Sequence, residues 1–161
     1  MNTSFEFFPP KTDEGKENLN NLIKSLSHFS PEYFSVTYGA AGSTRKGTLE
    51  TCVSVKNLGQ NACPHLCGIG SSKGVMKEIL NEFKGCGLTR IVALRGDLPS
   101  GISGFGDFPY ALDLIKFIKE EQGDFSIEVA AYPEIHPDAE SENTDFENFL
   151  NKVEAGADGA I

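Results

Sequence analysis

Five short apolar segments of this chain end in polar side chains whose types suit acid–base chemistry and the binding of a charged ligand. A carboxyl group, a hydroxyl, an imidazole, a guanidinium and a phenol all occur at these ends. The residues are Glu6, Thr37, His65, Arg95 with Asp97, and Tyr132 with His136. One such ending could arise by chance, whereas five in succession predict a ligand-binding mouth at the ends of consecutive strands.

Glu6 carries the sharpest chemical prediction, because three phenylalanines surround it in the segment Phe-Glu-Phe-Phe at 5–8. In a strand, Glu6 faces away from Phe5 and Phe7. A carboxylate among phenyl rings is costly to bury unless it is paired or protonated, so burial would favour the protonated form. We therefore expect Glu6 to be a buried proton donor. The alternative is a solvated glutamate at the edge or rim of the sheet.

His65 stands between Cys63 and Cys67 at alternate positions of the third segment. Three possible ligands on one face invite a zinc interpretation. Alternate positions on a strand spread over ~13 Å, however, which is too far for one ion with bonds of ~2.0–2.3 Å. We therefore expect no metal, with His65 pointing into a cofactor site and the two cysteines packing.

A glycine-rich segment at 68–74, Gly-Ile-Gly-Ser-Ser-Lys-Gly, follows this third segment. It loosely resembles a dinucleotide-binding fingerprint, but its spacing differs from GxGxxG and two strand–helix units precede it. We interpret it as an ordinary loop between a strand and a helix.

The segments that carry these residues alternate with amphipathic stretches. Runs typical of strands lie at 4–8, 33–38, 62–66, 90–95 and 126–132. Four of the intervening stretches repeat apolar residues at the i, i+3, i+4, i+7 spacing of a helix, and the stretch at 49–58 is less regular. A capping box at 144–147 predicts the start of the last helix. Strict alternation of strand and helix predicts an α/β protein with a parallel sheet.

Two architectures fit these units. A doubly wound sheet of flavodoxin or response-regulator type would be complete at five strands and would make the chain a binding module. A (β/α)8 TIM barrel needs eight units and ~250 residues. Residues 155–161 end a helix and begin what reads as a sixth strand. We therefore predict a single domain over 1–161 that forms the N-terminal five-eighths of a TIM barrel, truncated at the start of strand six.

Composition limits the binding partners and the cellular location that we expect. Fourteen Lys and Arg against 23 Asp and Glu give a net charge of −9, which argues against nucleic acid or an anionic membrane as partner. The sequence has no run of ~18 apolar residues that would span a bilayer, and its start lacks the basic region of a signal peptide. Four cysteines in 161 residues are too few for a disulfide framework, so we expect a cytoplasmic protein.

Five segments resemble methylenetetrahydrofolate reductase in its short bacterial form, in this order and on these strands. They read Phe-Glu-Phe-Phe-Pro-Pro at 5–10, Ser-Val-Thr-Tyr-Gly-Ala at 35–40, Pro-His-Leu at 64–66, Ala-Leu-Arg-Gly-Asp-Leu-Pro at 93–99 and Val-Ala-Ala-Tyr-Pro-Glu at 129–134. The combination is specific, although each segment alone is not. The resemblance implies a TIM barrel that holds FAD, in agreement with the truncated-barrel interpretation.

The resemblance also implies a reaction. NADH or NADPH would reduce FAD, which would reduce methylenetetrahydrofolate to methyltetrahydrofolate and so feed methionine synthesis. By motif matching, Glu6 would be the general acid, Asp97 would lie near the flavin ring and the folate, and substrate contacts would come from Glu6, Thr37 and Asp97. The positions that match FAD-binding residues are Thr37, Tyr38, Ala40, His65, Arg95, Gly96, Asp97, Tyr110, Ala111, Tyr132, His136, Ala139, Asp145, Asn148 and Lys152.

The similarity runs from residue 4 to 161 and leaves out the strands that would supply the remaining folate contacts. We therefore expect the isolated piece to be inactive. For the full-length protein we expect a homo-oligomer whose partners are a folate and a nicotinamide nucleotide.

Overall fold

The computed structural model describes residues 3–38, 43–97 and 104–161, and for residues 43 and 44 the backbone alone. Strands and helices alternate as predicted. The strands are β1 (Ser4–Phe7), β2 (Tyr33–Val36), β3 (Ala62–Cys67), β4 (Arg90–Leu94), β5 (Ser126–Val129) and β6 (Gly159–Ala160). The helices are α1 (Asp13–Leu26), followed by the 3₁₀ turn η1 (Ser27–Phe29), then α2 (Ser43–Asn57), α3 (Lys73–Gly85), α4 (Ala111–Glu121) and α5 (Glu142–Glu154). No helix in the described ranges has both the length and the apolar character of a membrane span.

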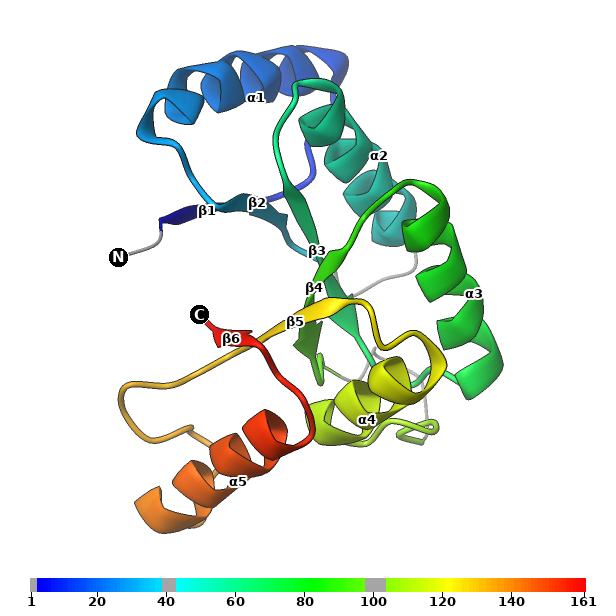
Figure 1. Cartoon of the computed structure of the whole chain (residues 1–161), viewed down its shortest axis with the longest axis vertical. Coiled ribbons are helices and arrows are strands. Elements are labelled where there is room, and N and C mark those ends of the chain that lie inside the picture. The colour runs from blue at the N-terminus through cyan, green and yellow to red at the C-terminus, as the bar shows by residue number, and fades with distance from the viewer. Residues whose placement is uncertain (1–2, 39–42, 98–103) are drawn as a thin grey trace.

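All six strands are parallel and form one sheet whose spatial order is the chain order, β1-β2-β3-β4-β5-β6. The sheet curves, with the helices arching around its outside and both termini on its open side (Figure 1). A flavodoxin-like sheet has the order 2-1-3-4-5 and helices on both faces. The binding-module alternative is therefore wrong, and the chain is part of a TIM-type barrel.

Three helices begin at a hydroxyl that accepts a hydrogen bond from a backbone amide. The residues are Thr12 for α1, Ser72 for α3 and Ser141 for α5. Each such cap stabilises its helix by about 1 kcal/mol. The predicted capping box at 144–147 is wrong, because Thr144 is already inside α5 and donates its amide to Ser141 Oγ at 3.2 Å.

The outer face of the sheet carries the hydrophobic core against the helices. Phe34 on β2 is fully buried, and its ring stacks on Phe5 and Phe7 of β1 with centroids 5.9 and 5.8 Å apart. Ile91 and Ala93 of β4 belong to the same buried cluster. Truncating a buried ring such as Phe34 to alanine costs ~3–5 kcal/mol, so this layer holds the strands in place.

The inner face is more polar, because the alternate strand residues that point away from the helices include several ionisable groups. The strand registers align Glu6 with Ser35, and His65 with Val92 and Glu128. Since neighbours in register lie on one face of a sheet, these side chains line the concave side.

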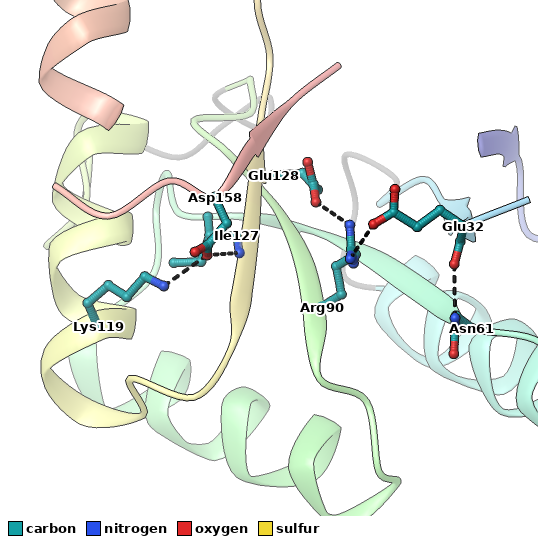
Figure 2. Close-up of polar contacts among 7 residues, drawn as sticks. All are labelled: Glu32, Asn61, Arg90, Lys119, Ile127, Glu128 and Asp158. Atoms are coloured by element: carbon teal, nitrogen blue, oxygen red, sulfur yellow. Dashed lines mark hydrogen bonds and ion pairs between the residues drawn. The ribbon is translucent and has the colours of Figure 1, made fainter. Parts of the chain in front are cut away.

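At the amino end of this face, Arg90 is held by two carboxylates (Figure 2). Its guanidinium donates to Glu128 Oε1 at 2.6 Å and to Glu32 Oε1 at 2.7 Å, and its Cζ lies 4.7 Å from the centroid of the Tyr33 ring. Burial works against the charge of Arg90, but the two carboxylates raise its pKa. Burial raises the pKa of Glu128 despite the guanidinium, and only 5% of that side chain is exposed.

Asp158, just before β6, joins two further elements at the same end of the sheet (Figure 2). Its carboxylate accepts from the Ile127 amide at 2.8 Å and from Lys119 Nζ at 3.0 Å. Partial burial opposes ionisation, yet these donors lower the pKa of Asp158. One carboxylate thereby ties the start of β6 to β5 and α4.

Four strands are shorter than predicted at their carboxyl ends. The expected runs 4–8, 33–38, 90–95 and 126–132 end at Phe7, Val36, Leu94 and Val129. Thr37, Arg95 and Tyr132 consequently lie on the loops that follow the strands.

Candidate cofactor and active site

A cavity of about 380 Å³ opens beyond the carboxyl ends of β4 and β5, bounded by the start of α4 and by α5. Its lining residues come from the segment after β4, the start of α4, the loop after β5 and helix α5. They are Arg95, Tyr110, Ala111, Leu112, Tyr132, His136, Asp138, Ala139, Asp145, Asn148 and Lys152. All of them except Leu112 and Asp138 are residues that motif matching predicts for the FAD site.

The hollow continues along α5 as a second cavity of about 500 Å³. This cavity shares Tyr132, Asp145 and Lys152 with the first and adds the apolar side chains of Phe146 and Phe149. An extended ligand with both charged and apolar parts would fit such a continuous hollow.

The loop between β5 and α5 is organised by His136 and Asp145. The amide of His136 donates to Asp145 Oδ2 at 3.0 Å, and His136 Nδ1 accepts from the amide of Asp138 at 3.0 Å. The rings of Tyr132 and His136 meet edge to face with centroids 4.6 Å apart. These contacts fix two aromatic side chains at the cavity wall.

Two cationic side chains line this cavity and are little neutralised by the described carboxylates. Lys152 Nζ donates to the carbonyl oxygen of Ala130 at 2.8 Å, and Lys152 is in no ion pair with any described carboxylate. Burial lowers the pKa of Lys152, and the charge of Asp145 partly opposes this. Arg95 lies 4.0 Å from Asp138 Oδ2, and 43% of its side chain is exposed. Both cations are therefore available to an anionic ligand.

Glu6 and His65 meet at the concave face near the ends of β1 and β3. Glu6 Oε2 lies 3.2 Å from His65 Nε2, with 49% of the Glu6 side chain exposed and 8% of the His65 side chain. The prediction that Glu6 is buried is therefore wrong: β1 lies at an edge of the described sheet, and solvent reaches its inner face. Burial lowers the pKa of His65, and the Glu6 carboxylate partly opposes this.

The segment after β4 passes very close to the end of β3. Gly96 has φ +78°, and a Cβ there would lie 2.8 Å from the Cβ of Cys67. Only glycine allows this turn without strain. Burial, followed by the charge of Asp97, raises the pKa of Cys67 to about 11. The Asp97 carboxylate therefore lies close enough to the end of β3 to affect this thiol. Tyr38 also lies near this thiol, and burial raises its pKa.

Two hydrogen bonds hold the backbone of Thr37 in place. Its amide donates to the carbonyl oxygen of Phe7 at 2.9 Å, and its carbonyl oxygen accepts from Thr48 Oγ1 at 2.8 Å. These bonds join β1, β2 and α2 at the site. Ala40, also predicted at the FAD site, lies outside the described residues.

The predicted residues thus fall into two neighbouring groups. One lines the cavity beside β4, β5 and α5, and the other follows the ends of β1 to β4, with Glu6 against His65 and Asp97 near Cys67. Motif matching missed two residues that line the cavity, Leu112 and Asp138. Leu112 directly follows the predicted Ala111 and Asp138 lies two positions after the predicted His136, which is the signal that could have pointed to them. Among the described residues, no three potential ligands are placed to hold one metal ion.

Comparisons with known sequences point to one family. The family model described as methylenetetrahydrofolate reductase matches residues 1–161. The 5,10-methylenetetrahydrofolate reductase of Escherichia coli is 45% identical over 162 residues, covering 100% of this chain and 54% of that protein. That of Pectobacterium carotovorum is 44% identical, covering 100% and 53%. The Arabidopsis thaliana protein named methylenetetrahydrofolate reductase (NADH) 1 is 38% identical, covering 96% and 29%.

The chain spans about half the length of the bacterial relatives it matches. Among solved structures, the carboxyl transferase domain of Rhizobium etli pyruvate carboxylase with pyruvate superposes with a TM-score of 0.65. The match covers 99% of this chain and 26% of that one at 11% sequence identity. At that identity the likeness concerns the fold alone.

Proposed function

Since the chain belongs to the methylenetetrahydrofolate reductase family, we propose that it supplies the cofactor site and the acid for reduction of methylenetetrahydrofolate to methyltetrahydrofolate. The cofactor in this proposal is FAD, and the electron donor is NADH or NADPH. The product would feed methionine synthesis. A relative whose name specifies NADH favours that nucleotide as the first donor to test.

The residues present fit FAD on three counts. The two adjoining hollows of about 380 and 500 Å³ suit an extended dinucleotide. Lys152 and Arg95 offer positive charge that the described carboxylates leave largely unused, as a pyrophosphate requires. Tyr132 and His136 supply aromatic surface. FAD would take hydride from the nicotinamide and deliver it to the folate.

Glu6 is the proposed general acid. Its carboxyl group is half exposed on the concave face, where a folate can reach it. Protonation of the folate at nitrogen would help to open the methylene bridge to a reactive iminium ion. Asp97 is proposed to stand near the flavin ring, where its negative charge opposes a negative charge on the reduced ring and so favours hydride release.

The observation that carries this proposal is the cavity at β4 and β5, nine of whose eleven lining residues are among those that motif matching assigns to FAD. The test is an anaerobic assay of the full-length gene product. We expect a yellow protein that releases FAD on denaturation and that reduces methylenetetrahydrofolate with NADH or NADPH. A colourless protein that cannot be reconstituted with FAD, or a flavoprotein inert toward this folate, would overturn the proposal.

A further inference from the structure

The contact between Glu6 and His65 joins two groups of very different exposure. Glu6 Oε2 lies 3.2 Å from His65 Nε2, and the two side chains are 49% and 8% exposed. The imidazole therefore touches the carboxyl group from the protein side, while water and any ligand reach it from the concave side.

His65 Nε2 is buried and makes no well-directed hydrogen bond within the described residues. The charged group in contact with it is the Glu6 carboxylate, whose Oε2 lies 3.2 Å away. A buried polar atom without a well-directed hydrogen bond is unusual, because most buried polar atoms are hydrogen-bonded. The distance of 3.2 Å is within the range of a hydrogen bond, although the two groups are not aligned as one. Nε2 would accept if the carboxyl group carries the proton, and would donate if the imidazole carries it.

Among the charged groups of the described residues, the Glu6 carboxylate acts on His65, whereas the charge of Asp97, after β4, acts on the thiol of Cys67. Beside His65 on β4 lies the apolar Val92, and beyond that Glu128, whose carboxylate is bound by Arg90 at 2.6 Å. On its own strand, burial raises the pKa of both Cys63 and Cys67, which keeps the thiols neutral. The β2 neighbour of Glu6 is the hydroxyl residue Ser35.

We propose that Glu6 and His65 form one acid–base pair that holds a single exchangeable proton, with His65 as the positioning residue for the catalytic acid Glu6. This inference rests on the proposed function and deepens it. Burial lowers the pKa of His65, so the imidazole is readily neutral and free to accept from the protonated carboxyl group.

The step moves one proton. The O–H bond of Glu6 breaks as an N–H bond forms on the folate, and the carboxylate that remains faces Nε2 of His65. Solvent returns a proton to the pair through the exposed side of Glu6. This step changes no oxidation state, because the hydride is delivered separately by the reduced FAD of the proposed reaction.

The first test is a histidine-labelled NMR titration of the full-length holoprotein. The chain has three histidines, and the spectrum of His65→Gln identifies the His65 signals. Glu6→Gln removes the charge that raises the pKa of His65, so we expect this pKa to fall further than in the wild type. The matched control is Cys63→Ala, on the same face of β3, which should leave the titration unchanged. An identical titration in Glu6→Gln and wild type would overturn the pair.

The second test is a double-mutant cycle on the rate at which methylenetetrahydrofolate reoxidises the flavin. We expect His65→Gln to slow this rate about tenfold in the wild-type background and to have little effect in the Glu6→Gln background. The pH profile of His65→Gln should also move to lower pH, because the neutral imidazole that accepts from the protonated carboxyl group, and so favours that form of Glu6, is gone. A tenfold loss in both backgrounds would show that His65 acts independently of Glu6 and would overturn the proposal.

The two tests separate this inference from the proposed function. Failure of the wild-type protein to reduce the folate would overturn the proposed function and the catalytic role of the pair together. The NMR comparison reports on the shared proton itself and does not depend on folate chemistry.

Discussion

An arginine lies at each end of β4, and the two are held very differently. Arg90, at the amino end, donates to Glu128 at 2.6 Å and to Glu32 at 2.7 Å, and 27% of its side chain is exposed. Arg95, just past the carboxyl end, is 43% exposed, and its ion-pair partner among the described residues is Asp138 at 4.0 Å. A neutralised cation thus begins β4, and an available cation directly follows it.

Two lysines repeat the contrast at the ends of β5. Lys119 Nζ donates to the carbonyl oxygen of Phe125 at 3.0 Å and to Asp158 at 3.0 Å. Lys152 Nζ donates to the carbonyl oxygen of Ala130 at 2.8 Å and is in no ion pair with a described carboxylate. Both ammonium groups hold a strand end, but only the one at the amino end is neutralised.

This division assigns the two ends of the sheet to different tasks. Charges at the amino end are paired within the protein and serve the fold, whereas charges at the carboxyl end are left to a ligand. TIM barrels in general place stability at the first end and chemistry at the second. The division predicts opposite responses to substitution, which the experiments below measure on the full-length protein.

Glu6→Gln should have the largest effect, and this effect should be on the reaction rate and not on stability. Loss of a general acid slows a reaction by ~10²–10⁴-fold, here the reduction of the folate, while the free energy of unfolding should change by less than ~0.5 kcal/mol because the side chain is half exposed. Stopped-flow kinetics and urea unfolding measure the two quantities. Ser35→Ala, at the neighbouring position in register, is the control and should leave the rate near wild type. A stable Glu6→Gln protein with full folate reduction would contradict the assignment.

Arg90→Met should show the reverse pattern. It leaves the Glu128 carboxylate buried without its cation, which costs about 3 kcal/mol of stability at neutral pH. Because burial raises the folded-state pKa of Glu128 above its unfolded value, this loss is present at neutral pH and shrinks as the pH falls and Glu128 becomes protonated. Urea unfolding at several pH values measures it. Arg90→Met with Glu128→Leu should recover most of the stability, and a loss independent of pH would contradict the explanation.

Gly96→Ala should cost about 2 kcal/mol, because a Cβ there is both strained at φ +78° and 2.8 Å from the Cβ of Cys67. Gly59 has the same φ of +78° but nothing within 4 Å of its Cβ position. Gly59→Ala is therefore the matched control and should cost about 1 kcal/mol, from backbone strain alone. Thermal unfolding of the two variants isolates the close approach at the site. Equal losses would mean that the contact with Cys67 is unimportant.

Asp158→Asn should have the smallest effect, about 1 kcal/mol after allowance for its partial exposure. The folded-state pKa of Asp158 is lowered by its donors, so its stabilisation is present above the unfolded carboxyl pKa and is lost as the pH falls through the folded value. The wild type should therefore lose more stability than the variant between neutral and acid pH. Parallel acid titrations followed by circular dichroism would reveal this, and parallel curves for both proteins would contradict it.

The order of elements could be predicted from the sequence because it depends on local periodicity. Apolar runs such as 62–66 and the spaced apolar residues of α3 are visible without knowing any long-range contact. The barrel-type strand order followed from the alternation together with the residues after α5. The residues that line the cavity could be predicted by motif matching, because the motifs lie at the ends of the strands that form the cavity wall.

The amino-end network was not predictable in the same way. Arg90 and Glu128 are 38 positions apart, and their pairing depends on a register in which Val92 aligns with Glu128. Nothing local to either residue specifies that register. The exposure of Glu6 was mispredicted for a related reason, because nothing local to Glu6 shows that β1 lies at an edge of the described sheet, where the side chain faces solvent and His65.

The most direct test of the division between the two ends is the affinity for FAD of two matched lysine variants. Equilibrium titration of the apoprotein with FAD, followed by flavin fluorescence, gives the Kd of Lys152→Met and of Lys119→Met. We expect Lys152→Met to bind roughly fivefold more weakly than the wild type, about 1 kcal/mol, and Lys119→Met to bind as the wild type does while unfolding more easily. Equal affinities for the two variants, or a weaker Lys119→Met, would contradict the placement of the cofactor at the carboxyl end.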